Sequence, residues 1–336
     1  DKLVSVIMPV YNGGIYLEQA IKSIIDQTYT NIELIIIDDG SKDDSLELIN
    51  RFMNADKRIS CLSRENKGLV YTLNELISMA KGDYIARMDA DDYSRPDRIK
   101  EQVDYLNANP QIYLCGTNFE IMSDDELTES DLKYLNIFKD MVDNFTTSPT
   151  DTIFYGHHLL HPTWMFRKQL IDLVGGYRNY KHYEDGEFLF RVAYNGLAVG
   201  KVDKTLLDYR VHAQSKSFIS SQQSELKLDS MRFHIDYYID SLKEDFTNRD
   251  IYIWGTAFTG ESTYRYLRNK SVDIKGFIDS NANIDFNNKP VYKPDEVDFS
   301  PESYVLISTN SGYNYASNYL RNKGLREYAD FAPTTA

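Results

Sequence analysis

Cysteine is scarce in this chain of 336 residues, which contains only Cys61 and Cys115. Two cysteines cannot build a disulfide framework or a cysteine-rich zinc site, and they fit a reducing compartment. The sequence also lacks a run of about 18 uncharged apolar residues, which crossing a bilayer requires. Its most apolar run, residues 34–37, ends in two aspartates and is typical of a buried strand. No secretory signal opens the chain, and its start at Asp1 rather than Met leaves open whether a segment precedes it.

Positive charge is also in short supply, with 37 Lys and Arg against 51 Asp and Glu and a net charge of -14. Nucleic acid is therefore not expected as a partner, because phosphate backbones require a basic face. A polybasic membrane anchor is not expected for the same reason. The length predicts two domains, and an apolar fraction of 42% allows both to bury a core.

The N-terminal part alternates short apolar runs with stretches of helical periodicity. A strand is expected over residues 4–8, closed by Pro9 because proline cannot continue a central ladder. A helix over 41–52 is expected, with Ser41 and Asp43 as N-cap candidates. The remaining elements are strands over 33–37, 59–62 and 84–88, and helices over 17–25, over 72–80 and from about Pro96. This alternation predicts a mostly parallel sheet with helices on both faces, whose ligands bind beyond the carboxyl ends of the strands.

Two acidic clusters, Asp38-Asp39 and Asp89 to Asp92, follow such strands. Adjacent carboxylates are costly there unless a cation or hydrogen bonds compensate them. Asp89 and Asp91 are two residues apart, so in an extended segment they point the same way. A divalent cation, Mn²⁺ or Mg²⁺, bound to a substrate diphosphate would suit this pair. The alternative is that Asp91 and Asp92 cap the helix that starts near Pro96.

Further short motifs accompany these clusters, and the ordered set resembles the inverting family-2 glycosyltransferases with the GT-A fold. The resemblance covers about residues 3 to 215, and the ordered set is far more specific than a lone Asp-x-Asp. In chain order the motifs are Val6-Ile7-Met8-Pro9-Val10-Tyr11-Asn12, Ile37-Asp38-Asp39-Gly40-Ser41, Asn66-Lys67-Gly68, Met88-Asp89-Ala90-Asp91-Asp92, His161-Pro162-Thr163, Met165-Phe166-Arg167, Gly175-Gly176-Tyr177, Glu184-Asp185 and Tyr209-Arg210-Val211-His212.

The resemblance implies a nucleotide-sugar site. Pro9 and Tyr11 would line the base pocket, and Asp39 would accept a hydrogen bond from a uracil imide. Arg87 and Asp89 would lie at the ribose and diphosphate side. The residues implied for nucleotide-sugar binding are Pro9, Tyr11, Asp39, Asn66, Gly68, Arg87 and Asp89.

The resemblance also implies a metal and a catalytic base. Asp91 would be the chief metal ligand, and His212 would help to hold the diphosphate or the metal, although an ordinary hydrogen-bonded loop histidine is the alternative. Asp185 would be the general base toward the acceptor hydroxyl, with Glu184 orienting its surroundings or exchanging roles with it. These two acids also suit the first turn of a helix, and both interpretations can hold together.

Three other histidines, His157, His158 and His161, are close in sequence but are not expected to bind zinc. No acidic or cysteine partner is adjacent to them. His161 is instead expected to support the acceptor pocket, His182 to lie near the catalytic base, and Trp164 to belong to the core.

The C-terminal third differs in character. Leu228, Met231 and Ile235 begin an amphipathic pattern that predicts a connecting helix packed on the first domain. Strands expected over 251–254, 274–278 and 304–308, with a helix to about residue 267, then predict a small Rossmann-like domain. Its turn, Gly255 to Gly260, has Ala257 where a dinucleotide-binding turn has its second glycine. Docking, oligomerisation or regulation is therefore favoured over NAD binding, although Asp279 is near the position of a ribose-binding acid.

Taken together, these features predict an α/β chain with a GT-A glycosyltransferase domain over 1–212, a helical connector over 213–247 and a Rossmann-like accessory domain over 248–332. The expected reaction is inverting transfer from a UDP-sugar to a hydroxyl of a glycan or lipid-linked glycan. The expected setting is bacterial surface polysaccharide synthesis (capsule, lipopolysaccharide or teichoic acid) in the cytoplasm, with peripheral association at the inner membrane face left open. A homo-oligomer or a partner enzyme would bind through the C-terminal domain.

Three rival functions are weighed against this one. A nucleotidyltransferase is disfavoured because no Lys or Arg follows the first strand until Lys22. A catalytically weak nucleotide-sugar-binding or scaffold protein of the same fold is the main alternative. A redox enzyme centred on the C-terminal domain would bind a nicotinamide cofactor.

Overall fold

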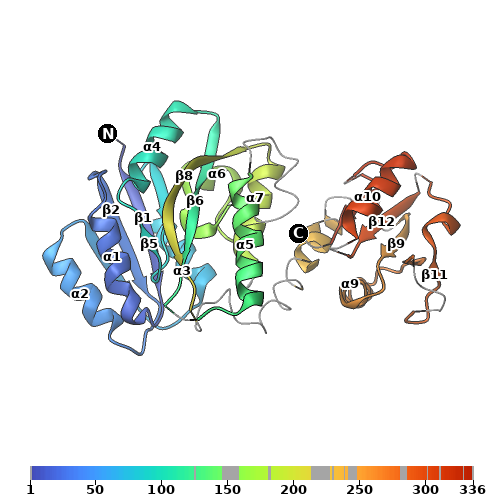
Figure 1. The fold of residues 1–336 in the computed structure, drawn as a ribbon, viewed down its shortest axis with the longest axis horizontal. Helices are drawn as coiled ribbons and strands as arrows, with labels where there is room; N and C mark the ends of the chain where they lie inside the picture. Colours follow the sequence, from blue (N-terminus) through green and yellow to red (C-terminus); the bar gives the residue numbers. More distant parts are fainter. Residues whose placement is uncertain are drawn as a thin grey trace. The chain divides into compact units, whose positions relative to one another are not determined.

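The chain forms two compact units, Asp1–Ile219 and Ser220–Ala336, which are described separately (Figure 1). The structure is a computed structural model that describes residues 2–124, 126–145, 159–180, 183–212, 228, 231–237, 239–240, 248–280, 286–300, 302–309, 312–327 and 329–334. The predicted domain boundaries after residues 212 and 247 both adjoin residues outside these ranges, and they stay predictions.

A mixed eight-stranded sheet, in the order β3-β2-β1-β4-β7-β6-β8-β5, forms the centre of the first unit. Strands β3, β2, β1 and β4 are parallel, whereas β7 is antiparallel to both of its neighbours and β5 is antiparallel to β8. The strands are β1 (Val4–Val10), β2 (Ile32–Asp38), β3 (Ile59–Ser63), β4 (Tyr84–Arg87), β5 (Tyr93–Ser94), β6 (Ile112–Met122), β7 (Met165–Arg167) and β8 (Ala198–Arg210).

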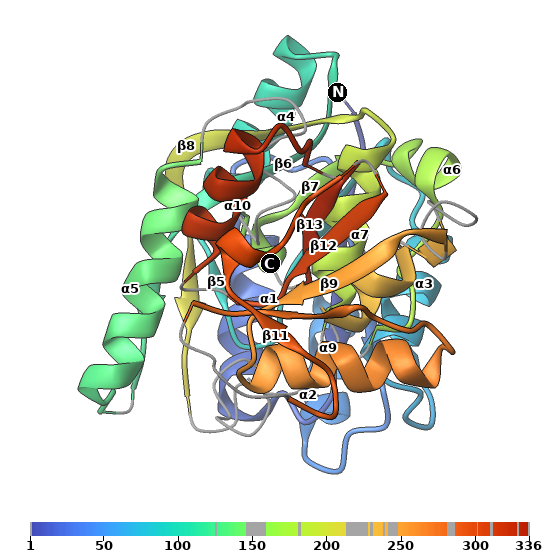
Figure 2. The same cartoon turned by 90° about the vertical axis from the view of Figure 1, so that its right-hand side faces the viewer.

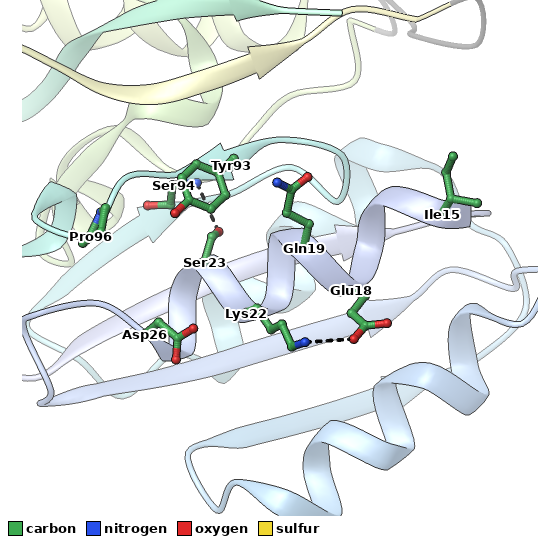
Figure 3. Close-up of a pocket in the computed structure, with 9 residues that line it drawn as sticks. All are labelled: Ile15, Glu18, Gln19, Lys22, Ser23, Asp26, Tyr93, Ser94 and Pro96. Carbon is green, nitrogen blue, oxygen red and sulfur yellow. Dashed lines mark hydrogen bonds and ion pairs between the residues drawn. The ribbon is translucent and has the colours of Figure 1, made fainter. Parts of the chain in front are cut away.

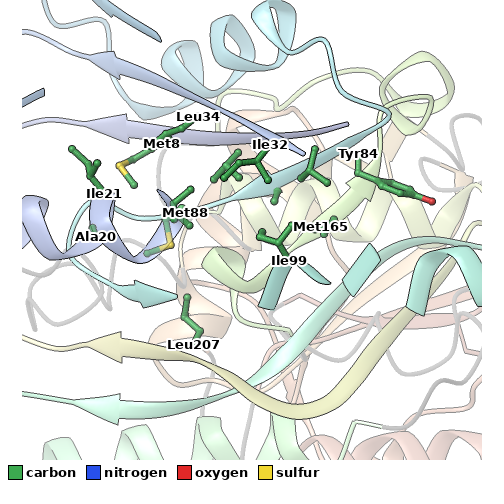
Figure 4. Close-up of a cluster of buried hydrophobic side chains, with 14 of the residues drawn as sticks. Met8, Ala20, Ile21, Ile32, Leu34, Tyr84, Met88, Ile99, Met165 and Leu207 are labelled. Carbon is green, nitrogen blue, oxygen red and sulfur yellow. The ribbon is translucent and has the colours of Figure 1, made fainter. Parts of the chain in front are cut away.

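Helices cover both faces of this sheet, because its central strands are apolar on both sides. Val6 and Met8 of β1 belong to a core with α1, α2 and α4, whereas Ile7 faces a second core with α3, α6 and α7. Figure 4 shows part of the first core. The helices are α1 (Leu17–Ile25), α2 (Ser45–Ala55), α3 (Leu69–Met79), α4 (Arg98–Ala108), α5 (Glu129–Asp143), α6 (Leu170–Val174) and α7 (Glu184–Tyr194), with short 3-10 turns η1 (Gly14–Tyr16) and η3 (His161–Thr163).

Strand β1 does not end at Pro9, as the sequence predicted, but continues to Val10. The Val10 carbonyl accepts from Asp39 N on the β2 side, and the Ile7 carbonyl accepts from Met88 N on the β4 side. Because bonding sides alternate along a strand, Pro9 faces β4, whose pairing with β1 ends at Arg87. The missing N–H of Pro9 therefore removes no ladder bond.

Two helices begin a few residues later than the sequence predicted. Helix α2 begins at Ser45 with Asp44 as its N-cap, so neither Ser41 nor Asp43 caps it. The Asp43 carboxylate accepts from the amide of Ser45, the first residue of α2, and from the Gly14 amide. The second bond ties the loop after β1 to the loop after β2. The helix expected from Pro96 is α4, which begins at Arg98 and has Asp97 as its N-cap.

Five parallel strands, in the order β11-β10-β9-β12-β13, form the sheet of the second unit (Figure 2). Gly260 is required near the start of the helix that follows the first strand, because a Cβ there would lie 2.0 Å from the Gly255 carbonyl oxygen. The elements are β9 (Asp250–Trp254), α9 (Phe258–Asn269), β10 (Gly276–Ile278), β11 (Val291–Tyr292), a 3-10 turn η4 (Pro294–Glu296), β12 (Ser303–Ile307), α10 (Tyr313–Asn322) and β13 (Phe331–Pro333).

The helix expected to pack on the first domain belongs to the second unit instead. Met231 and Ile235 lie in the same core as Ile253 of β9 and Leu267 of α9. Their apolar side chains cover one face of the C-terminal sheet. The helical periodicity of the sequence shows that this helix has an apolar side, but not which of the two sheets that side packs against. Most of the predicted connector over 213–247 lies outside the described residues.

No helix among the described residues is long and apolar enough to cross a membrane. His157, His158 and His182, which were weighed as candidate site residues, lie outside the part of the chain that the structure describes.

Candidate active site

Three loops meet at one edge of the first sheet, where β1, β2 and β4 end. The register pairs Val10 with Asp38 and Ile7 with Arg87, so the residues that follow these strands emerge together. Both acidic clusters predicted from the sequence are on these loops. This is the edge at which parallel α/β sheets bind ligands.

Asp39 is buried and already holds the loop before α3. Its Oδ1 accepts from the Lys67 amide at 2.8 Å and from the Arg64 guanidinium, and its Oδ2 accepts from the Gly68 amide at 2.9 Å. A carboxylate offers about four lone-pair positions, so about one on Oδ2 is left for a ligand. Gly68 has a φ of +85°, a conformation that favours glycine.

The surroundings of Asp39 are open. Tyr11 is 54% exposed and Asn66 is exposed, whereas Pro9 is half-buried. Gly40 lets the loop after β2 approach the loop of Asn66, since a Cβ on Gly40 would lie 2.8 Å from the Asn66 nitrogen. The predicted base-side residues thus lie on loops that touch one another.

Asp89, Asp91 and Asp92 form the second cluster, with one carboxylate oxygen of each within 4.8 Å of the others. His212 Nε2 lies 3.0 Å from Asp91 Oδ2, and the Arg210 amide donates to Asp92 Oδ1 at 2.8 Å. Asp92 Oδ2 is buried and has no hydrogen-bond partner among the described residues. The alternative in which Asp91 and Asp92 cap the following helix is wrong, because Asp97 holds that place.

Asp92 is the member of this cluster whose role the sequence missed. Adjacency to Asp91 was the available signal, but in a flat strand neighbouring residues point to opposite sides. The loop after β4 is not a strand, and β8 returns at Arg210 to turn Asp92 inward. Only the tertiary structure shows this.

Electrostatics in the cluster are unfavourable without a counter-charge. Burial, followed by the neighbouring Asp89 and Asp91 carboxylates, raises the pKa of Asp92 well above its usual range. Burial and the charge of Asp89 also raise the pKa of Asp91, which His212 opposes. Three converging carboxylates, one with an unpartnered buried oxygen, are a donor set that fits a hard divalent cation.

Two arginines lie beneath this cluster. Arg87 Nη1 is 2.5 Å from Asp89 Oδ2; burial would lower the pKa of Arg87, but the charge of Asp89 outweighs it and raises the pKa. Arg98, which the sequence analysis did not single out, donates to the Arg87 carbonyl at 3.0 Å and to the Pro162 carbonyl at 2.7 Å. Burial lowers the pKa of Arg98 to about 10. Arg98 therefore ties the strand that leads into the loop of the acidic cluster to the turn at η3.

Glu184 and Asp185 occupy the first turn of α7, as the helix interpretation of this pair expected. Glu184 is buried, and Asp185 is half-buried with its Oδ1 accepting from the Gly186 amide at 2.7 Å. Burial, followed by the charges of Asp185 and Glu184 against that of Arg87, raises the pKa of Tyr177. Tyr177 therefore lies within electrostatic range of both the acid pair and Arg87.

His161 is buried against Tyr177, with its Nε2 2.7 Å from the Tyr177 hydroxyl. Trp164 is fully buried, as predicted for a core residue, and its ring lies 4.6 Å from that of His161.

A separate hollow of about 470 Å³ lies between α1 and residues 93–96, lined by Gln19, Tyr93 and others (Figure 3). None of the predicted site residues lines it.

Two groups of predicted site residues are thus assembled by the fold. Asp39 and Gly68 are hydrogen-bonded on the base side, and Asp91 and His212 meet in the acidic cluster beside the Arg87–Asp89 pair. The acid pair of α7 and Arg87 share Tyr177 as an electrostatic neighbour.

Comparison with known proteins agrees with this geometry. The sequence matches the family described as "Glycosyl transferase family 2" over residues 5–174. It is 31% identical over 262 residues to an uncharacterised glycosyltransferase of Haemophilus influenzae, covering 72% of this chain and 76% of that protein. It is 30% identical over 218 residues to the O-antigen biosynthesis glycosyltransferase WbnJ of Escherichia coli, covering 63% of this chain and 81% of that protein.

Solved structures share the fold at low sequence identity. The S. aureus TarS fragment in complex with UDP superposes with a TM-score of 0.54 at 19% identity, covering 70% of this chain and 65% of that one. The mannosyltransferase PcManGT from Pyrobaculum calidifontis, in complex with GDP-Man and Mn²⁺, gives a TM-score of 0.53 at 16% identity, covering 72% of this chain and 65% of that one. The chain thus spans slightly less than two thirds of these structures.

These likenesses confirm the predicted fold class, a GT-A-like mixed α/β unit followed by a parallel, Rossmann-like sheet. On the family match and the long alignment with its H. influenzae relative, the chain belongs to glycosyl transferase family 2.

Proposed function

We propose that this chain is an inverting glycosyltransferase that moves a sugar from a UDP-sugar to a hydroxyl of a glycan or lipid-linked glycan. The acidic cluster is the observation that carries the proposal. Three carboxylates converge within 4.8 Å and one buried oxygen lacks a partner among the described residues, an arrangement suited to a divalent cation on a diphosphate. The S. aureus TarS structures, described as complexes with UDP and with UDP-GlcNAc, support the choice of nucleotide.

On the donor side, the uracil would lie between Pro9, Tyr11 and the loop of Asn66 and Gly68. Its imide N–H would donate to the open position on Asp39 Oδ2. Arg87 and Asp89 would contact the ribose and diphosphate side.

Asp91, together with Asp92 and His212, would hold Mn²⁺ or Mg²⁺. When bound, such a cation neutralises charge on the departing nucleoside diphosphate. The PcManGT structure, a complex with GDP-Man and Mn²⁺, supports a divalent metal in a protein of this fold. The choice between the two ions is part of the proposal.

On the acceptor side, Asp185 would take the proton of the acceptor hydroxyl while the hydroxyl oxygen bonds to the anomeric carbon. The bond from that carbon to the phosphate oxygen breaks, and its electron pair leaves with the diphosphate. Attack from the opposite face inverts the anomeric configuration. The half-buried place of Asp185 in the first turn of α7 supports this role, since acids are favoured at that end of a helix.

The proposed setting is bacterial surface polysaccharide synthesis at the cytoplasmic face of the membrane. Similarity to WbnJ, which is described as an O-antigen biosynthesis glycosyltransferase, supports this setting. We also propose the predicted domain division, and docking or oligomerisation through the C-terminal unit. A nucleotide-sugar-binding protein without turnover remains the alternative function.

Calorimetric titration of UDP with and without Mn²⁺ tests the donor site. We expect Mn²⁺ to strengthen binding at least tenfold in the natural chain, and we expect Asp91→Ala to abolish this effect. Asp104→Ala is the matched control, because Asp104 is an exposed acid paired only with Lys100 among the described residues.

A second measurement separates transfer from binding. Release of UDP from UDP-sugars should depend on Mn²⁺ and on Asp91. Metal-dependent UDP binding without turnover on any donor or acceptor would favour the binding-protein alternative. No UDP binding under either condition would refute the proposal.

A further inference from the structure

The loop Gly175-Gly176-Tyr177 is fixed by side chains from two helices. Asn74 of α3 pairs with the backbone of Tyr177, donating to its carbonyl at 2.8 Å and accepting from its amide at 2.8 Å. Arg191 of α7 donates to the Val174, Gly175 and Gly176 carbonyls. These side-chain hydrogen bonds pair backbone groups of the loop and fix its position against α3 and α7.

The two glycines are there for different reasons. Gly175 has a φ of +78°, the left-handed region in which a Cβ is unfavourable. A Cβ on Gly176 would lie 2.3 Å from Asn74 Oδ1, so only glycine at this position leaves room for the Asn74 side chain. The approach of Asn74, which is 103 residues from Tyr177 in the sequence, therefore requires a glycine at position 176.

The Tyr177 side chain on this loop contacts His161 and α7. Its hydroxyl is 2.7 Å from His161 Nε2, and its ring stacks on Phe188 at 4.7 Å and 27°. Phe188 is in α7, the helix whose first turn carries Glu184 and Asp185. A shift of Tyr177 would therefore change its contact with His161 and its contact with α7, the helix that carries the acid pair.

We infer that Asn74 is a positioning residue of the catalytic centre, acting through the backbone of Tyr177 to fix the Tyr177 hydroxyl on His161 and the Tyr177 ring on α7. The inference rests on the proposed function, in which α7 supplies the general base. Asn74 itself touches neither the acid pair nor the acidic cluster in any contact among the described residues. Its effect on turnover must therefore pass through Tyr177.

A double-mutant cycle between Asn74→Ala and Tyr177→Phe tests this route. Misplacement of a reacting group by about 1 Å lowers turnover by about 100-fold. We expect each single variant to lower kcat for UDP release by about 10- to 100-fold, with the Kd for UDP and Mn²⁺ within about twofold of the natural chain. Because both changes act on one element, kcat of the double variant should be within about threefold of kcat of the less active single variant.

Ser78→Ala is the matched control on the same helix. Ser78 is exposed, and its hydroxyl donates only to the Glu75 carbonyl of its own helix among the described contacts. This variant should keep kcat, KM and the Kd for UDP unchanged. Asn74→Asp is the conservative partner variant, because it keeps an acceptor for the Tyr177 amide but loses the donor to the carbonyl. It should retain part of the activity that Asn74→Ala loses.

A readout that does not need activity separates this inference from the proposed function. In ¹⁵N spectra of the histidine side chains, the His161 Nε2 signal, assigned with His161→Gln, should shift in both Asn74→Ala and Tyr177→Phe. An unchanged His161 signal in Asn74→Ala would overturn the inference, as would kcat losses that simply multiply in the double variant. Unfolding of both Asn74 variants would also overturn it, since Asn74 would then have only a structural role. Absence of turnover in the natural chain, with the His161 shift present, would refute the proposed function alone.

Discussion

Replacing Asp92 by asparagine should stabilise the metal-free protein at neutral pH. The substitution removes one buried negative charge from the proposed metal site. The asparagine keeps the Oδ1 that accepts from the Arg210 amide. It removes a charge whose other oxygen has no partner among the described residues and which two acids repel. Most substitutions of buried polar residues destabilise a protein, so the expected sign is itself a test.

Its magnitude follows from the spacing of the cluster. Two unit charges 4.8 Å apart repel by about 3.5 kcal/mol at an effective dielectric constant of about 20, and the ligand oxygens lie no farther apart than that. The positive charge of Arg87 offsets part of this repulsion. We therefore expect a gain of about 1 to 3 kcal/mol, or a rise in Tm of several degrees for a unit of this size.

The gain should depend on pH in a defined direction. Because the folded state raises the pKa of Asp92, the folded protein binds this proton more tightly than the unfolded chain does. The penalty is absent below the unfolded pKa of about 3.9, grows as the pH rises toward the folded pKa, and is complete above it. The advantage of Asp92→Asn should accordingly be largest at pH 7.5 and shrink as the pH is lowered toward 4.

Thermal unfolding in EDTA at several pH values measures this, with Asp97→Asn as the control. Asp97 is an exposed acid whose carboxylate accepts from the Thr28 hydroxyl, and its replacement should change stability little. Adding Mn²⁺ should reduce the advantage of the variant, since the natural chain gains about 2.7 kcal/mol at 100 times its Kd and the variant gains less. A variant less stable than the natural chain in EDTA at pH 7.5 would refute the electrostatic reasoning.

Three further predictions concern other parts of the first unit. Asp185→Asn should lower turnover by about 10² to 10⁴-fold while UDP affinity by calorimetry stays within about twofold; normal turnover would remove Asp185 as the base. Gly176→Ala should lower the free energy of unfolding in urea by about 1 to 3 kcal/mol, because its Cβ would lie 2.3 Å from Asn74 Oδ1. Gly196→Ala is the contrasting case, because its Cβ meets nothing within 4 Å and its cost would come from its φ of +70° rather than from a clash. Cys115 is buried and Cys61 is half-buried, and burial raises the pKa of Cys61 to about 11 and that of Cys115 to about 12. At pH 8 Cys115 should react with a disulfide reagent only after the protein is denatured, and Cys61 should react more slowly than a free thiol. Rapid modification of the native protein would contradict this burial.

The sequence alone determined the elements whose signal is local. Apolar runs that end in aspartates predicted the parallel strands β2 and β4 and placed Asp39 and Asp91 at the ligand-binding edge, because strand direction and side-chain alternation are properties of a few adjacent residues. The ordered motifs predicted the family, which the comparisons confirm. The predicted roles of the individual site residues remain to be tested.

The tertiary structure decided whatever depends on contacts between distant residues. Pro9 could remain in β1 only because β4 ends beside it, and Met231 and Ile235 could cover either sheet until the fold assigned them to the second. Asp92 turns inward because β8 returns at Arg210, and Gly176 is needed because Asn74 docks on Tyr177 from 103 residues away. Periodicity records which side of an element is apolar, but not which partner it meets; that is fixed only when packing and buried hydrogen bonds are satisfied together.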